Sequence, residues 1–158
     1  MQNVLGDLHP PYSKEQLVQL FTSGDLPLDA LLQITARLDP EPILFPPNTR
    51  LMLQGEPGDG LYFIAQGTVE VTLTPFGPGS PFPPVTIAKL SAGGVVGEMA
   101  LVNNEPRIAT VTALDDVTAY RLSIDNWRYV EAFHPGLAAK IREVAVRRGS
   151  ELARTQNV

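Results

Sequence analysis

The stretch from Gly97 to Val111, GEMALVNNEPRIATV, holds the residues best suited to ligand chemistry in this chain. Gly97 lets a ligand approach the backbone with no Cβ in the way, and residues 98–101 favour a helix. The first N–H groups of such a helix have no partner and attract phosphate. Arg107 follows the rigid Pro106, and its planar guanidinium matches two phosphate oxygens. The spacing therefore predicts a phosphate-binding site.

Glu98 requires a different partner, because its carboxylate would repel a phosphate. A pair of ribose hydroxyls suits it, so Glu98 and Arg107 together predict a nucleotide monophosphate as the ligand. A simpler interpretation is a salt bridge between these two residues across a surface turn, which would add little stability. The pattern around them favours the nucleotide.

Two motifs follow one another in this chain. The second consists of Gly97, Glu98, Met99, Ala100, Leu101, Pro106, Arg107, Ala109 and Thr110. The first consists of Gly55, Glu56, Pro57, Gly58, Asp59, Tyr62, Ile64, Gly67, Val69 and Val71. They resemble the phosphate-binding cassette and the turn-strand-turn-strand signature of cyclic nucleotide-binding domains, the family of bacterial catabolite activators, kinase regulatory subunits and nucleotide-gated channels. The resemblance extends from about Leu31 to about Arg148.

The resemblance implies a site for cAMP or cGMP, with no other cofactor. It implies that Gly97 and Ala100 offer backbone N–H groups, that Glu98 holds the ribose 2′-hydroxyl, and that Arg107 neutralises the cyclic phosphate. Ile108 departs from the small or hydroxyl-bearing residue usual in the family, and Val96 replaces an aromatic residue. The predicted ligand-binding residues are Gly97, Glu98, Met99, Ala100, Arg107, Ile108, Ala109, Arg147 and Arg148.

Composition narrows the class of protein. The chain has 158 residues, 44% of them hydrophobic and 18% charged, which suits one globular domain. A net charge of -5 disfavours a protein that mainly binds nucleic acid. The absence of cysteine rules out disulfides and thiolate zinc sites and fits a cytoplasmic location. No stretch has the apolar length to span a bilayer, and we expect no direct DNA binding.

Catalysis has little support in the sequence. The two histidines, His9 and His134, have no nearby serine and acid that would suggest a triad, and His134 is expected at a helix end. No Walker A loop, HExxH motif or carboxylate cluster is present, so we predict no enzyme activity and no metal site. Asp115 and Asp116 are expected in a turn between strands.

The flanks of the chain have the periodicity of helices. Ser13 is a plausible N-cap for a helix over residues 14–22, and Asp125 for a short helix that ends before Pro135. A second N-terminal helix is predicted to end at Pro40 and Pro42, and a longer C-terminal one starts near Leu137. The apolar stripe expected on the second helix consists of Leu28, Leu31, Leu32, Ile34 and Leu38.

The centre of the chain alternates short β-rich runs with glycine and proline turns, at 61–64, 68–73, 85–88, 109–113 and 117–122. This spacing predicts a jelly-roll-like barrel. We therefore expect an α+β fold, an antiparallel β-roll flanked by N-terminal and C-terminal helices. The expected parts of a single domain over 1–158 are N-terminal helices at 1–41, a β-roll at 42–123 with the cassette at 97–111, and C-terminal helices at 124–158.

The segment at 75–84, PFGPGSPFPP, reads as an extended hairpin loop, because its prolines and glycines cannot continue a strand. Disorder and a contact surface formed by Phe76 and Phe82 are both compatible with its composition.

The predicted function is a cyclic nucleotide sensor that moves its C-terminal helix as output. In the family this helix folds over the bound base or pairs with its copy in a dimer, so Arg147 or Arg148 would stack on the base. The expected partners are a cyclic nucleotide and a second copy or an effector protein. The alternative is a degenerate relative that keeps the fold as an interaction or dimerisation module and binds no nucleotide.

Overall fold

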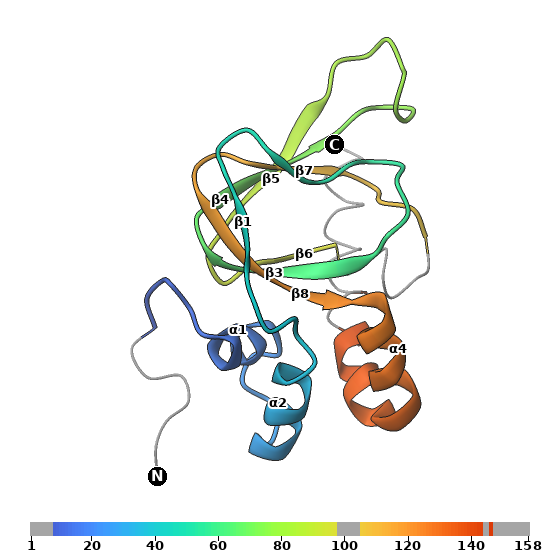
Figure 1. The fold of residues 1–158 in the computed structure, drawn as a ribbon. Coiled ribbons are helices and arrows are strands. Elements are labelled where there is room, and N and C mark those ends of the chain that lie inside the picture. The colour runs from blue at the N-terminus through green and yellow to red at the C-terminus, as the bar shows by residue number, and fades with distance from the viewer. Residues whose placement is uncertain (1–7, 98–104, 144–145, 147–158) are drawn as a thin grey trace.

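The computed structural model describes residues 8–97, 105–143 and 146, and its strands form two four-stranded antiparallel sheets that build a roll (Figure 1). One sheet has the order β1 (Ile43–Phe45), β8 (Val117–Ser123), β3 (Gly60–Gln66) and β6 (Val95–Val96). The other has the order β2 (Arg50–Met52), β7 (Thr110–Ala113), β4 (Thr68–Leu73) and β5 (Val85–Ser91). The predicted α+β class with an antiparallel roll and flanking helices is confirmed.

Helix α1 (Lys14–Phe21) begins where the sequence indicated. The Ser13 hydroxyl accepts from the backbone N–H of Gln16, and the Gln16 side chain accepts from the N–H of Ser13. The predicted N-cap at Ser13 is confirmed, and the structure adds the reciprocal bond from Gln16 that makes it a capping box.

Helix α2 (Leu28–Thr35) ends earlier than predicted, well before Pro40. The backbone leaves the helix because it bonds elsewhere: the Arg37 carbonyl accepts from Asn126 Nδ2 at 2.9 Å, and Asp39 N–H donates to the Arg121 carbonyl at 2.8 Å. The expected apolar stripe is also partly wrong. Leu31, Ile34 and Leu38 are buried, whereas Leu28 and Leu32 are 55% and 50% exposed.

Helix α4 (Ile124–Phe133) is capped by Ser123 and not by Asp125, which corrects the prediction. The chain passes directly from β8 into the helix, so the last strand residue accepts the N–H of Asn126 at 3.2 Å. Asp125 lies in the first turn, where its charge complements the helix dipole. His134 follows the last residue of α4 as its C-cap, which confirms its expected place at a helix end, and residues 135–143 are helical again.

Strand β3 separates two hydrophobic cores and is therefore buried on both faces. Leu61 and Phe63 face a core shared with the helices, and Tyr62 and Ile64 face the interior of the roll. Helices α1, α2 and α4 gather on the side of β3 and β8 (Figure 1). The helix-side core contains Leu17, Phe21, Leu31, Ile34, Trp127, Val130, Leu137 and Ile141.

The segment at 75–84 forms the predicted hairpin loop between β4 and β5 and projects from the end of the roll away from the helices (Figure 1). The rings of Phe76 and Phe82 contact each other with centroids 5.4 Å apart, and Phe76 is 90% exposed. A partner for these rings stays a prediction. No helix among the described residues has the length and apolarity to cross a membrane.

Alanine substitutions at two glycines with positive φ distinguish the cost of backbone strain from the cost of a steric clash. A Cβ at Gly67 (φ +98°) would collide with the Asp116 carbonyl, whereas a Cβ at Gly79 (φ +85°) would meet open space. We expect Gly79→Ala to lower the free energy of unfolding by about 1 kcal/mol through strain alone, and Gly67→Ala by about 3 kcal/mol because a backbone carbonyl must also move. Urea denaturation measures both. Equal losses would contradict the assigned clash.

Candidate functional site

The two sequence motifs meet at Arg107, which lies just before β7 and is only 4% exposed. Its backbone N–H donates to the Glu56 carbonyl at 2.8 Å, and its carbonyl accepts the N–H of Gly55 at 2.8 Å. The turn between β2 and β3 is therefore bonded to the residue that the sequence assigned to a phosphate.

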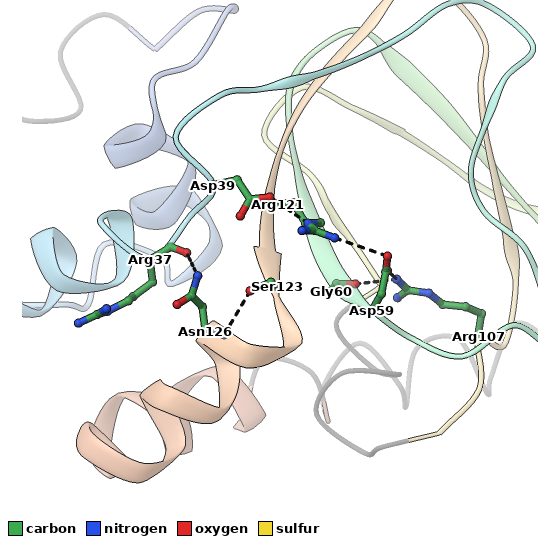
Figure 2. Close-up of polar contacts among 8 residues, drawn as sticks. All are labelled: Arg37, Asp39, Asp59, Gly60, Arg107, Arg121, Ser123 and Asn126. Carbon is green, nitrogen blue, oxygen red and sulfur yellow. Dashed lines mark hydrogen bonds and ion pairs between the residues drawn. The ribbon is translucent and has the colours of Figure 1, made fainter.

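The guanidinium of Arg107 makes three hydrogen bonds, and Figure 2 shows those to Asp59 and Gly60. Nη2 donates to Asp59 Oδ1 at 3.0 Å and to the Gly60 carbonyl at 2.7 Å, and Nη1 donates to the Gly97 carbonyl at 3.0 Å. An arginine side chain has five N–H donors. Its Nε–H and one Nη1–H thus have no partner among the described residues.

Asp59 lies between two arginines (Figure 2). Its second oxygen is 3.6 Å from Nη1 of Arg121, and Arg121 Nε donates to Asp39 Oδ2 at 2.9 Å. The hydrogen bond to Asp39 raises the pKa of Arg121, so this side chain stays cationic. Four alternating charges therefore connect Arg107 to the segment that follows α2.

Tyr62 on β3 is buried and lies opposite Arg121 on the neighbouring strand β8. Burial, and secondly the charge of Asp59, raise the pKa of its phenol above 10.0. Tyr62 is therefore a neutral group beside the charges at neutral pH.

Gly97 has a role that the sequence did not indicate. Its φ is +88°, and an added Cβ would collide with Nη1 of Arg107. The sequence predicts that the missing Cβ lets a ligand approach the backbone. In the structure the arginine itself occupies that space, so Gly97 is needed to place Arg107.

The structure brings together part of the predicted site. Gly97 and Arg107 are hydrogen-bonded to each other, and of the two residues that follow the arginine Ile108 is half-buried and Ala109 is buried. Five predicted residues lie outside the described ranges: Glu98, Met99, Ala100, Arg147 and Arg148. The alternative salt bridge from Glu98 to Arg107 lies outside them too.

Asp59 is the residue that sequence reasoning missed, although it belongs to the turn motif that the sequence singled out. Its place in that motif was the available signal, but nothing in the spacing connected it to an arginine 48 positions later. Within the described ranges no group of three His, Cys, Asp or Glu residues could hold a metal ion.

The family described as "Cyclic nucleotide-binding domain" matches residues 42–130, more than half of the chain. The chain is 34% identical over 119 residues to a cyclic nucleotide-gated potassium channel of Rhizobium etli, covering 75% of this chain and 30% of the channel. It is 31% identical over 134 residues to a cAMP-dependent protein kinase regulatory subunit of Emericella nidulans, covering 73% of this chain and 32% of the subunit.

Among solved structures, the regulatory domain of Toxoplasma gondii PKA with cAMP has a TM-score of 0.73 at 24% identity, covering 87% of this chain and 49% of that one. This likeness concerns the fold. The chain belongs to the cyclic nucleotide-binding domain family, and it spans about a third of the length of the channel and the kinase subunit that it matches.

Two aspartates of similar exposure test the support of Arg107. Asp59 is 62% exposed and pairs with a buried guanidinium, and Asp25 is 59% exposed and pairs with Lys140 at 2.9 Å. We expect Asp59→Ala to cost about 2 kcal/mol of unfolding free energy, because it leaves a buried cation without its anion. Asp25→Ala should cost at most about 0.5 kcal/mol. Thermal denaturation checks both, and similar small losses would mean that the carbonyls alone satisfy Arg107.

Proposed function

We propose that this domain binds cAMP or cGMP as a regulatory sensor, with Arg107 as the group that binds the cyclic phosphate. The observation that supports this most is the state of the guanidinium: it is buried, fixed by three bonds, and retains two N–H donors without a partner among the described residues. A cation held in this way is prepared for an anion with two acceptor oxygens.

The other predicted contacts complete the proposed site. Backbone N–H groups of Gly97 and Ala100 would bind phosphate oxygens, and Glu98 would bind the ribose 2′-hydroxyl. Met99, Ile108 and Ala109 would line the same pocket. A cyclic phosphate carries one negative charge, so its binding beside Asp59 requires either that Asp59 moves away or that Arg121 continues to neutralise it.

The proposed output is a change in the position of the C-terminal helix. In this structure its beginning is packed: Leu137 and Ile141 belong to the helix-side core, and Lys140 Nζ is 2.9 Å from Asp25 Oδ2. Arg142 pairs with Glu131 of α4. A ligand shifts this arrangement only if it contacts one position of the helix better than another, and Arg147 or Arg148 stacking on the base would supply that difference.

The proposed partners beyond the nucleotide are a second copy of the chain, through the C-terminal helix, or an effector protein. The alternative function is a module that keeps this fold for such contacts and binds no nucleotide. Calorimetric titration with nucleotides separates the two functions, because the interaction module would give no heat of binding.

Arg107→Lys tests the phosphate contact while it keeps a positive charge beside Asp59. We expect the variant to bind cAMP or cGMP more weakly by about 2 kcal/mol, roughly thirtyfold, because an ammonium cannot provide the planar pair of donors. Calorimetric titration with cAMP, cGMP and AMP measures this loss.

The matched control is Arg50→Lys, at an exposed position on β2, which should bind as the wild type does. Unchanged affinity in Arg107→Lys would remove the arginine from the site. A folded wild type that binds none of the three ligands at millimolar concentration would favour the interaction module.

Ile108 is half-buried and offers no hydroxyl where the family has a small or hydroxyl-bearing residue. We expect measurable but weakened binding in the wild type, and Ile108→Ser should improve it by about 1 kcal/mol, roughly fivefold, through one added hydrogen bond. Ile108→Ala separates size from hydrogen bonding: if it improves affinity as much as serine does, the isoleucine acts by bulk. Weaker binding in both variants would contradict this prediction.

A further inference from the structure

Gln54 joins the hairpin between β4 and β5 to the turn between β2 and β3. Its Nε2 donates to the Thr74 carbonyl at 3.1 Å, and its Oε1 accepts the N–H of Thr74 at 2.8 Å. The side-chain amide thus satisfies both peptide groups of one residue at the base of the hairpin. Pro78 lies over the next turn residue, since a Cβ added to Gly55 would be 3.0 Å from its Cγ.

The backbone of the same segment holds the arginine. The N–H of Gln54 donates to Thr110 Oγ1 at 3.0 Å, and the two following residues exchange hydrogen bonds with the backbone of Arg107. Three consecutive residues, 54–56, therefore contact the hairpin through a side chain and the cassette through their backbone. A displacement of Gln54 has to move the peptide groups that position Arg107.

We infer that Gln54 is a positioning residue of the nucleotide site, and that through it the hairpin at 74–84 sets the position of Arg107. The inference rests on the proposed function, since it concerns affinity for a cyclic nucleotide. Gln54 touches no ligand in this scheme. Gln54 positions Arg107 because its neutral side-chain amide pairs with both the N–H and the carbonyl of Thr74, and this pairing permits only one orientation of the turn.

Gln54→Glu tests the inference through protonation. The ionised carboxylate still accepts from Thr74 N–H, but its second oxygen faces the Thr74 carbonyl with no hydrogen between them. Protonation restores a donor at that oxygen. This repulsion and the half-buried site disfavour the charged form, so the introduced carboxyl should titrate above the usual range for glutamate.

Few charged groups near residue 54 could perturb the titration of the introduced carboxyl. The hairpin side, residues 71–88, has no charged residue. Charged residues on the elements that hold Gln54 are Arg50, Glu56, Asp59, Glu70, Lys89 and Arg107. The phosphodiester of cAMP or cGMP stays anionic between pH 5 and pH 8, so the ligand's phosphate charge does not change.

The experiment measures cyclic nucleotide affinity by calorimetry between pH 5 and pH 8 in the wild type, Gln54→Glu and Gln66→Glu. Gln66 is an exposed glutamine at the end of β3, so its variant makes the same chemical change away from the turn. We expect Gln54→Glu to bind about tenfold more weakly than the wild type at pH 8, and to approach the wild type at pH 5. Gln66→Glu should follow the wild type throughout.

The Arg107 amide resonance in ligand-free Gln54→Glu provides a second readout, and it should shift with the same midpoint as the affinity. If Gln54 had a purely structural role, Gln54→Glu would become less stable as the pH rises, but the affinity of the folded fraction and the Arg107 resonance would stay unchanged. This result would overturn the inference. If Gln54→Glu does not fold, Thr110→Val removes the acceptor of the Gln54 N–H and should weaken binding severalfold. Wild-type affinity in that variant would also overturn it.

The outcomes separate the two proposals. A wild type that binds no cyclic nucleotide defeats the proposed function and the inference with it. A wild type that binds, with an affinity that Gln54→Glu and Thr110→Val leave unchanged, defeats the inference alone.

Discussion

The burial of one positive charge is the constraint on which the rest of this structure depends. A guanidinium that is 4% exposed is costly unless hydrogen bonds and an opposite charge compensate it. Asp59 supplies the charge, and the carbonyls of Gly60 and Gly97 supply further acceptors. Gly97 must lack a Cβ for the arginine to fit. Asp59, Gly60 and Gly97 thus serve a single side chain before any ligand is considered.

The same side chain connects the two sheets of the roll. Gly97 follows β6 and Gly60 begins β3, both in one sheet, whereas Arg107 precedes β7 in the other. Its three bonds therefore cross from sheet to sheet at the point where the motifs meet. A phosphate bound there would contact a guanidinium that three hydrogen bonds already hold, which lowers the entropy lost on binding.

The sequence predicted features that depend on neighbouring residues. The N-cap at Ser13 and the strand at Thr68–Leu73 are examples, because capping and alternation are local. It failed where distant contacts decide. Ser123 replaces Asp125 as a cap because β8 runs directly into α4, α2 ends early because Arg37 and Asp39 bond to other elements, and Asp59 reaches an arginine 48 residues away. The family motifs singled out Arg107 and the turn that contains Asp59, but the ion pair between these two residues could be recognised only in the fold.

Arg107 is supported from two sides by interactions of different kinds. Toward the helices, Asp59, Arg121 and Asp39 form an ionic chain, and Asp59 is 62% exposed, so salt screens it and an incoming phosphate can replace it. Toward the hairpin, the support is the neutral amide of Gln54, which neither salt nor a phosphate competes for. An anion that takes over the guanidinium can therefore release the aspartate on the helix side while the backbone of the arginine stays in place. If the domain binds a cyclic nucleotide as proposed, the phosphate would act on the helix side through Asp59, while the hydrogen bonds of Gln54 would keep the hairpin side in place.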